Sequence, residues 1–125
     1  MPATAISCSV VVPVYNGAAT LTELVAELDR ALRPLTAAFE VLLVDDGSSD
    51  PSWQVITELA RQHPWVRGLH LMRNFGQHNA LLCGIRAARH DLIVTLDDDL
   101  QNPPDQISKL LARLAEGYDV VYGVP

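Results

Sequence analysis

The chain has 125 residues, of which 49% are hydrophobic and 19% are charged, and its formal net charge at pH 7 is −6. This length and composition predict one compact globular domain and exclude an intrinsically disordered chain. The basic residues are few and scattered, which disfavours a nucleic-acid-binding surface because such a surface needs a basic stripe to neutralise phosphates.

Apolar, β-branched runs predict five strands along the chain. They lie at 7–14, 40–44, 66–72, 91–96 and 119–122. Within the first two runs the hydrophobic residues are continuous, without polar alternation. This pattern is typical of strands buried on both faces of a parallel sheet.

Helical patterns separate these strands. The first is predicted to begin at a capping box of Thr20 and Glu23, and the second at the N-cap Asp50 followed by Pro51. The third covers 77–89, and the fourth begins at Pro104 and ends at Gly117. Two of the predicted buried faces are Leu21, Leu24, Val25, Leu28 and Leu32 in the first helix, and Leu81, Leu82, Ile85 and Ala88 in the third.

The alternation of strands and helices predicts an α/β fold, a doubly wound and mainly parallel sheet with helices on both faces. No repeat or linker composition divides residues 1–125, so we expect a single domain. Because the chain ends directly after the fifth predicted strand, we expect this domain to be truncated at its C-terminus. Ligands of such folds bind beyond the carboxyl ends of the strands.

The two cysteines, Cys8 and Cys83, lie in apolar or helical patterns and are interpreted as buried thiols of a reducing compartment. The N-terminus lacks the layout of a signal peptide, and no apolar stretch reaches the roughly 20 residues that a bilayer requires. We therefore expect a cytoplasmic chain, located at the inner face of the membrane in a full-length protein. Membrane contact is expected only through sequence beyond this chain.

Polar residues follow the first two predicted strands. Pro13, Tyr15 and Asn16 present an aromatic ring and an amide after the first strand, although an ordinary strand-to-helix turn explains them equally well. The adjacent carboxylates Asp45 and Asp46 follow the second strand. Since like charges repel, they require hydrogen-bond donors or a cation nearby, and one of them could accept the imide hydrogen of a nucleobase.

The fourth predicted strand ends in three consecutive carboxylates, Asp97, Asp98 and Asp99, followed by Leu100 and Gln101. A Mg²⁺ or Mn²⁺ ion would relieve their repulsion and leave positions open for substrate phosphates. In an extended backbone, Asp97, Asp99 and Gln101 project to the same side. The alternative is a solvated acidic turn before the next helix, but such a turn does not account for three acids in a row.

Three segments together resemble the family 2 glycosyltransferases with the GT-A fold, whose nucleotide-binding half is Rossmann-like. They are 13–16 (PVYN), 44–50 (VDDGSSD) and 97–101 (DDDLQ). The likeness spans nearly the whole chain and corresponds to the N-terminal part of the family's domain. Segments 73–78, 100–104 and 117–121 are similar to the branch that acts on polyprenyl phosphates, the dolichyl- and undecaprenyl-phosphate glycosyltransferases.

The resemblance implies roles for individual residues. The residues that match the nucleotide-binding positions, together with their neighbours in the two motifs, are Pro13, Tyr15, Asn16, Val44, Asp45, Asp46, Asp97 and Asp98. Asp99 and Gln101 match the metal-binding positions, and Asp97 and Asp99 are the catalytic candidates. Gly17 stands where a glutamate is common and Asp98 where an alanine is usual. Arg73 and His78 are weaker candidates for contact with a phosphate.

The function implied is metal-dependent, inverting transfer of a sugar from a nucleoside-diphosphate sugar to an acceptor, which in this branch is a polyprenyl phosphate. Two alternatives stay open: transfer to a saccharide hydroxyl, and a non-catalytic fragment that binds nucleotide or a partner protein. A dinucleotide-dependent oxidoreductase is disfavoured because the first turn lacks the G-x-G-x-x-G spacing. A phosphohydrolase with an aspartate nucleophile is disfavoured because its following threonine and lysine are missing.

Overall fold

The computed structural model describes residues 7–34, 36–96 and 120–122. Within them, five parallel strands form one sheet in the order β3-β2-β1-β4-β5. The strands are β1 (Ser7–Val14), β2 (Ala38–Asp45), β3 (Val66–His70), β4 (Leu92–Thr95) and β5 (Val120–Tyr122). The predicted α/β fold class is confirmed.

The strand bounds agree with the sequence prediction to within two residues. β1 has the predicted bounds, and β2 begins at Ala38, ahead of the predicted start at Glu40. β3 ends at His70, so Met72 lies outside the strand, and its side chain is 98% exposed. An apolar residue at the end of a run was therefore wrongly included in the strand.

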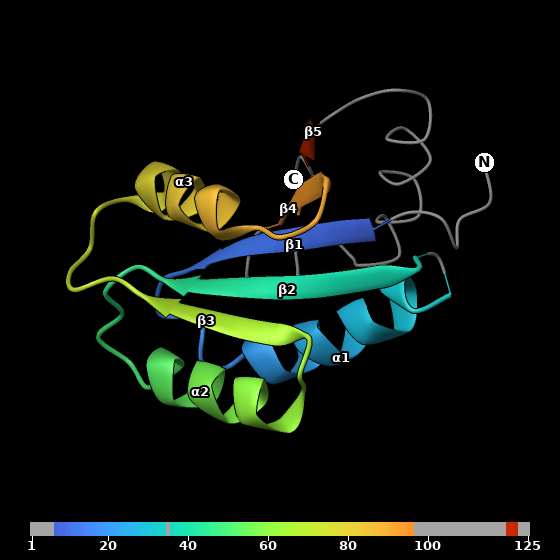
Figure 1. The fold of residues 1–125 in the computed structure, drawn as a ribbon. Helices are drawn as coiled ribbons and strands as arrows, with labels where there is room; N and C mark the ends of the chain where they lie inside the picture. Colours follow the sequence, from blue (N-terminus) through green and yellow to red (C-terminus); the bar gives the residue numbers. More distant parts are fainter. Residues whose placement is uncertain (1–6, 35, 97–119, 123–125) are drawn as a thin grey trace.

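Among the described residues, three helices cover the sheet: α1 (Leu21–Leu32), α2 (Ser52–Gln62) and α3 (Gln77–Ala87). In Figure 1, α1 and α2 lie on one face of the sheet and α3 lies on the opposite face. This arrangement makes the sheet doubly wound, as predicted. The helix predicted from Pro104 to Gly117 lies outside the described residues.

Each face of the sheet has its own core. The larger cluster packs β1, β2 and β4 against the predicted leucine face of α1, all five members of which are buried, and includes Cys8. Burial raises the pKa of the Cys8 thiol to about 12, so this thiol is inert. The smaller cluster, Val11, Leu42, Val44 and Ala80, lies beneath α3. Both cysteines are free, and Cys83 is only partly buried.

The starts of α1 and α2 differ from the predicted caps. Thr20 makes no side-chain cap bond; its hydroxyl instead donates to the carbonyl of Gly17 at 3.2 Å, so the predicted capping box is not formed. Pro51, not Asp50, stands at the N-cap of α2. The Asp50 carboxylate nevertheless accepts from the backbone N–H of Ser52 at 2.9 Å, which satisfies one of the donors at the helix start.

The buried face of α3 consists of small residues rather than the predicted large ones. Ala80 and Gly84 are buried, whereas Leu82 is 41% exposed and lies outside the buried face. An ideal Cβ on Gly84 would lie 2.3 Å from Cγ1 of Val11. Gly84 therefore allows α3 to approach β1 closely, and the larger side chains Leu81 and Ile85 pack only partly against the sheet.

A polar network is buried where β1, β2 and β3 start. The Glu40 carboxylate accepts from Ser9 Oγ at 2.7 Å, from Arg67 Nη1 at 2.8 Å and from the backbone N–H of Arg89 at 2.6 Å. Arg67 also donates to the carbonyl of Ala87 at 3.0 Å. The network therefore fastens the segment that leaves α3 to the first three strands.

In the described ranges, no helix is both long enough and apolar enough to cross a membrane.

Candidate functional site

The candidate site lies where the strand order reverses. From β1 the chain continues to β2 and β3 on one side, and then crosses to β4 on the other side of β1. In α/β sheets a crevice opens beyond the carboxyl ends of the strands at such a point. The loops that follow β1, β2 and β3 leave the sheet at this edge.

Asn16 fastens the loop after β1 to the loop after β2. Its backbone is in the left-handed region, with φ of 54°, which asparagine tolerates better than most residues. Its side-chain oxygen accepts from the backbone N–H groups of Ser49 at 2.9 Å and Asp50 at 3.2 Å. Its own N–H donates to Ser48 Oγ at 2.9 Å. The predicted nucleotide-contacting amide thus also maintains the geometry of the site.

Asp50 adds a second link between the same loops. Its Oδ2 accepts from the backbone N–H of Ala18 at 3.2 Å, and Ser52 Oγ accepts from the N–H of Gly17 at 3.0 Å. Partial burial raises the pKa of Asp50, but the hydrogen bonds from Ser52 and Ala18 outweigh it and leave this pKa below its ordinary value. The carboxylate is therefore charged over the neutral pH range.

Asp46 and Gly47 hold the loop between β3 and α3. The Asp46 carboxylate accepts from the backbone N–H groups of Phe75 at 2.8 Å and Gly76 at 3.1 Å. Gly47 has φ of 69°, and a Cβ there would lie 2.4 Å from backbone atoms of Arg73 and Asn74. Only glycine fits this contact, so the two loops pack backbone against backbone.

Asp45 is buried beside His70 at the end of β3. Its Oδ1 accepts from the N–H of Ser48 at 3.2 Å, and its Oδ2 lies 3.3 Å from Nε2 of His70. That second oxygen has no hydrogen-bond partner of good geometry within the described ranges. The His70 ring stacks on Trp53, with the ring centroids 4.3 Å apart. An ion pair forms here only when His70 is protonated.

The two carboxylates therefore have the donors that the sequence required of them. Ser48 donates to Asp45, and Phe75 and Gly76 donate to Asp46. All three donors are backbone N–H groups. Every residue type except proline has such a group, so the amino-acid sequence does not reveal these donors. Sequence reasoning consequently missed Ser48 and Phe75 as parts of the site.

The other predicted nucleotide-binding residues near β1 and β2 differ in exposure. Tyr15 is 51% exposed directly after β1, beside the point where the strand order reverses. Pro13 is buried and pairs in register with Val44, which is fully buried beneath α3. Tyr15 is thus the predicted residue whose side chain is accessible to a ligand, and nucleotide contact by Pro13 and Val44 stays a prediction.

The weaker candidates Arg73 and His78 are both exposed near the start of α3. The Arg73 guanidinium lies 4.8 Å from the centroid of the Phe75 ring, which is within the range of a cation–π interaction. Asp46 and Gly47 contact the backbone of Phe75 and Arg73, so this pair lies in a loop that is held beside the loop after β2.

The predicted metal-binding segment lies outside the described residues: Asp97, Asp98, Asp99 and Gln101 all belong to the range 97–119. Leu96, the residue before this segment, donates its N–H to the carbonyl of Val11 at 3.1 Å, beside β1. Within the described ranges, no three histidine, cysteine, aspartate or glutamate side chains are grouped to hold a metal ion. The metal site stays a prediction.

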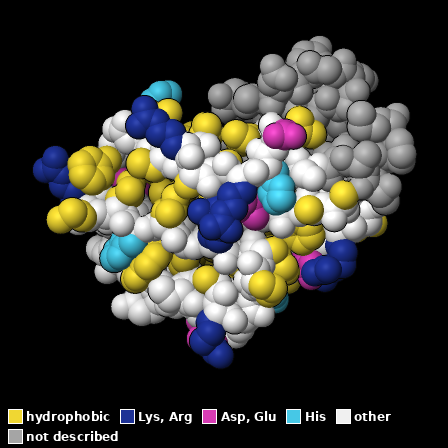
Figure 2. All heavy atoms as spheres, in the orientation of Figure 1, with side chains coloured by type: hydrophobic (Ala, Val, Ile, Leu, Met, Phe, Trp, Pro, Cys, Tyr) yellow, Lys and Arg dark blue, Asp and Glu magenta, His cyan; other side chains and the backbone are white. Residues whose placement is uncertain are grey.

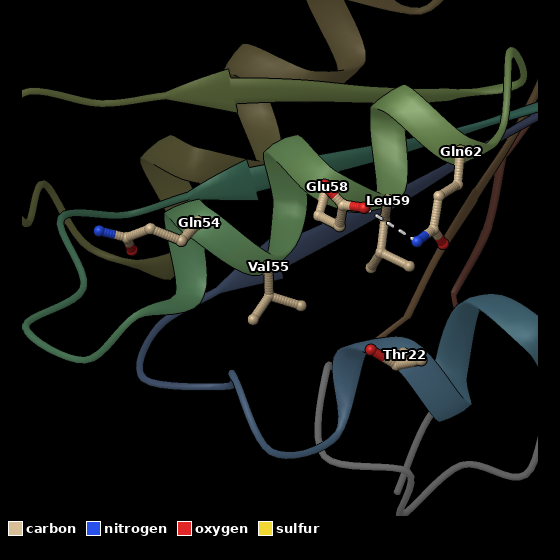
Figure 3. A pocket seen from close by; sticks show the side chains of 6 residues that line it. All are labelled: Thr22, Gln54, Val55, Glu58, Leu59 and Gln62. Carbon is tan, nitrogen blue, oxygen red and sulfur yellow. Dashed lines mark hydrogen bonds between the residues drawn. The ribbon is translucent and has the colours of Figure 1, made fainter.

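A separate groove runs between α1 and α2 (Figure 3). Its volume is about 290 Å³, and it is lined by Thr22, Gln54, Val55, Glu58, Leu59 and Gln62. None of these residues belongs to the sequence-predicted site. In Figure 3 the side chains of Gln62 and Glu58 are joined by a hydrogen bond of 3.1 Å, which occupies polar atoms at the end of the groove.

Comparisons with known proteins agree with the resemblance. The model of the family described as glycosyl transferase family 2 matches residues 9–125. The undecaprenyl-phosphate 4-deoxy-4-formamido-L-arabinose transferase of Pseudomonas paraeruginosa is 51% identical over 114 residues, which cover 90% of this chain and 34% of the relative. The protein of the same name from Klebsiella pneumoniae is 49% identical, with 90% and 35% covered. The chain thus spans about a third of the length of these relatives.

Solved structures have the same fold. S. aureus TarS 1-349 has a TM-score of 0.71 and 28% identity, with 89% of this chain and 33% of that chain covered. The mannosyltransferase PcManGT from Pyrobaculum calidifontis, solved in complex with GDP-Man and Mn²⁺, has a TM-score of 0.78 and 24% identity, with 93% and 34% covered.

Proposed function

The chain belongs to glycosyl transferase family 2, and on that premise we propose that it is the nucleotide-sugar-binding part of a metal-dependent, inverting glycosyltransferase. The donor is a nucleoside-diphosphate sugar and the acceptor is a polyprenyl phosphate. The proposed part is a single domain that comprises residues 1–125, and the complete enzyme is longer.

One observation carries the nucleotide-binding proposal: Tyr15 is exposed at the point where the strand order reverses, in a loop that Asn16 holds in place. An aromatic ring fixed in this position offers a stacking surface for a base. The preformed loop network removes the entropic cost of ordering the loops when the ligand binds. Asp45 and Asp46 lie at the same edge, where their buried carboxylates accept from backbone N–H groups and so hold the neighbouring loops in place.

The metal proposal rests on the sequence of the acidic segment. Asp99 and Gln101 would supply oxygen ligands of the kind that Mg²⁺ and Mn²⁺ prefer. A bound ion would neutralise the charge that develops on the departing diphosphate. The chain's own contribution is to hold the nucleotide against Tyr15, with Asp97 on the ribose and sugar-phosphate side.

The acceptor proposal rests on the relatives. They are named as transferases to undecaprenyl phosphate and match this chain at about half of its positions. A phosphate acceptor is already an anion and needs no strong general base, whereas a saccharide hydroxyl does. Such an acceptor places the full-length enzyme at the inner face of the membrane.

Calorimetric titration of the chain with UDP and with GDP, each with Mn²⁺ and again with EDTA, tests the proposal. We expect binding of one of the two nucleotides, and we expect EDTA to abolish it. Tyr15→Ala should lower the affinity about tenfold, given roughly 1–3 kcal/mol for the stacking of a base on an aromatic ring. Phe39→Ala, an aromatic truncation away from the site, is the matched control and should leave the affinity of the folded fraction unchanged.

The metal ligands are tested by Asp99→Ala against Asp91→Ala, an exposed aspartate before β4. Asp99→Ala should remove the Mn²⁺-dependent part of the binding and Asp91→Ala should not. Full metal-dependent binding by Asp99→Ala would refute the assigned ligand. If a well-folded chain bound neither nucleotide under any condition, the proposed site itself would be wrong.

A further inference from the structure

Charge is distributed unevenly along this acidic chain. Between Glu58 and Asp91 the sequence has five arginines and four histidines, with no aspartate or glutamate, although the net charge of the whole chain is −6. This stretch includes α3 and the loop that precedes it. This stretch of sequence therefore carries a charge opposite to that of the whole chain, although Arg61 and Arg67 are paired with Glu58 and Glu40.

Exposed apolar side chains coincide with the acid-free region. Met72 is 98% exposed, Phe75 44% and Leu82 41%, and apart from Tyr15 these are the exposed large hydrophobics among the described residues. Met72 and Phe75 lie in the loop before α3, and Leu82 lies on the helix. Figure 2 shows yellow and dark blue side chains together over this part of the molecule, at the left and upper left.

The exposed positions of α3 form one face. His78, Leu82 and Arg86 follow one another at intervals of four residues, so they lie along the same side of the helix. The buried Ala80 and Gly84 face the sheet on the opposite side. With Met72, Arg73 and Phe75, these three exposed residues make up what we call the α3 surface.

The arginines of the α3 surface carry uncompensated charge within the described ranges. Arg30, Arg33, Arg61 and Arg67 each form an ion pair with a described acidic side chain. Arg73 and Arg86 form no such pair there, and both are exposed. Two guanidinium groups are thus available to an external anion, beside three apolar side chains.

We propose that the α3 surface binds an anionic lipid bilayer, so that this chain, and not only sequence beyond it as first expected, contacts the membrane. Met72, Phe75 and Leu82 enter the headgroup region, and Arg73 and Arg86 contact lipid phosphates, as arginines at membrane interfaces do. The inference rests on the proposed function, because a lipid-linked acceptor has to reach the site from a membrane. Asp46 and Gly47 hold the loop of the α3 surface against the loop after β2, so binding there brings the candidate site close to the lipid.

The charge pattern favours a bilayer over a second copy of the chain. A second copy would bring two arginine-bearing surfaces together. Elsewhere in its described part this acidic molecule exposes one large hydrophobic side chain, Tyr15, rather than a group of them. An anionic bilayer offers both an apolar phase and the opposite charge.

Co-sedimentation of the 125-residue chain with vesicles tests the proposal. Vesicles of phosphatidylcholine with about one third phosphatidylglycerol should bind the chain at low salt, whereas vesicles of phosphatidylcholine alone should not. Binding should weaken at high salt because ions screen the interaction of arginine with lipid. Arg86→Gln should lower the partition coefficient about fivefold, as expected for one basic residue near an anionic surface. The double variant Met72→Ser and Leu82→Ser should also have a lower partition coefficient than the wild-type chain, and this decrease should not depend on the salt concentration.

Arg30→Gln is the matched control, since Arg30 is exposed on α1 and paired with Glu27. It should leave the partition coefficient unchanged, and circular dichroism should confirm that each variant is folded. The proposal is overturned if the folded wild-type chain binds neither vesicle, or if Arg30→Gln and Arg86→Gln have equal effects. It is also overturned if sedimentation velocity without lipid detects self-association that Met72→Ser removes, because the surface would then belong to a second copy.

The nucleotide titration separates this proposal from the proposed function. None of the residues changed in the vesicle experiment is assigned to nucleotide or metal. Vesicle binding without nucleotide binding would retain the membrane surface and reject the donor site. Nucleotide binding without vesicle binding would retain the donor site and reject the membrane surface.

Discussion

At the scale of single residues, polar side chains near the site serve mainly to position backbone. Asn16 and Asp46 use their oxygens to bind N–H groups of neighbouring loops. The two bonds to the charged carboxylate of Asp46 contribute about 1.5–3 kcal/mol each. A ligand therefore meets a surface whose shape is already fixed.

Glu40 is the centre of the polar network at the end of the sheet where β1, β2 and β3 start. Burial raises its pKa, but the hydrogen bonds from Arg67, Ser9 and the Arg89 N–H, together with the charge of Arg67, outweigh burial and hold the pKa below its ordinary value of 4.5. A group whose pKa is lowered by folding stabilises the folded state in its charged form. That contribution is complete above about pH 4.5 and is lost as the pH falls through the folded-state pKa.

Glu40→Gln should lower the free energy of unfolding at pH 7 by about 2 kcal/mol, because the amide group turns a donor towards N–H and O–H donors. Urea denaturation of both proteins measures the difference. The difference should shrink as the pH falls below about 4.5, where the wild-type carboxylate also becomes protonated. Glu58→Gln, which removes an exposed ion pair with Arg61, is the control and should change stability little. A pH-independent difference for Glu40→Gln would contradict this account.

At the scale of elements, β1 and β2 could be predicted because most of their residues are buried and their apolar residues are continuous. The buried face of α3 could not be predicted in the same way. A helix that packs through Ala80 and Gly84 places small residues inward, so the large apolar residue Leu82 misled the assignment. The predicted cap at Thr20 does not form because the backbone of Thr20 is in the helical region, with φ of −111° and ψ of −13°, whereas a capping residue is typically extended.

Gly84→Ala tests the close approach of α3 to β1. The added methyl group overlaps Cγ1 of Val11, and overpacking of this kind costs about 1–3 kcal/mol. The gain in helix propensity is only roughly 1 kcal/mol. We therefore expect a net loss of about 1 kcal/mol in the free energy of unfolding, measured by urea denaturation.

Two further proteins make this test specific. Arg86→Ala, on the exposed side of α3, should change stability by less than about 0.5 kcal/mol. In a Val11→Ala background the overlap is relieved, so Gly84→Ala should become neutral or stabilising there. Equal effects of Gly84→Ala in both backgrounds would mean that the contact with Val11 does not limit the approach.

At the scale of the whole molecule, the fold class could be predicted, but the hydrogen bonds that join the loops of the candidate site could not. The contacts made by Asn16 and Asp46 join residues 29 to 34 positions apart in the sequence. Their partners are backbone groups, which every residue type except proline offers. The pairing of Asp45 with His70 likewise depends on the register of β2 and β3.

A single domain should unfold as one cooperative unit. Differential scanning calorimetry should give one transition with a calorimetric enthalpy equal to the van't Hoff enthalpy. Nucleotide and Mn²⁺ at about a hundred times the dissociation constant should raise the Tm of that transition as a whole by on the order of 10 °C. Two transitions, only one of which shifts, would contradict the single-domain proposal. Tyr15→Ala at the same ligand concentrations is the control, and its Tm should rise less because it binds the nucleotide more weakly.

The position of β1 within the sheet has a consequence for how the chain is made. β1 pairs with β2 on one side, but its partner on the other side, β4, follows far along the chain, with Cys8 opposite Leu92. At translation rates of about 5–20 residues per second, on the order of ten seconds separate the emergence of these strands from the ribosome. Throughout that interval the apolar edge of β1 has no native partner, so we expect the nascent chain to depend on chaperones and to aggregate when synthesis stalls before β4.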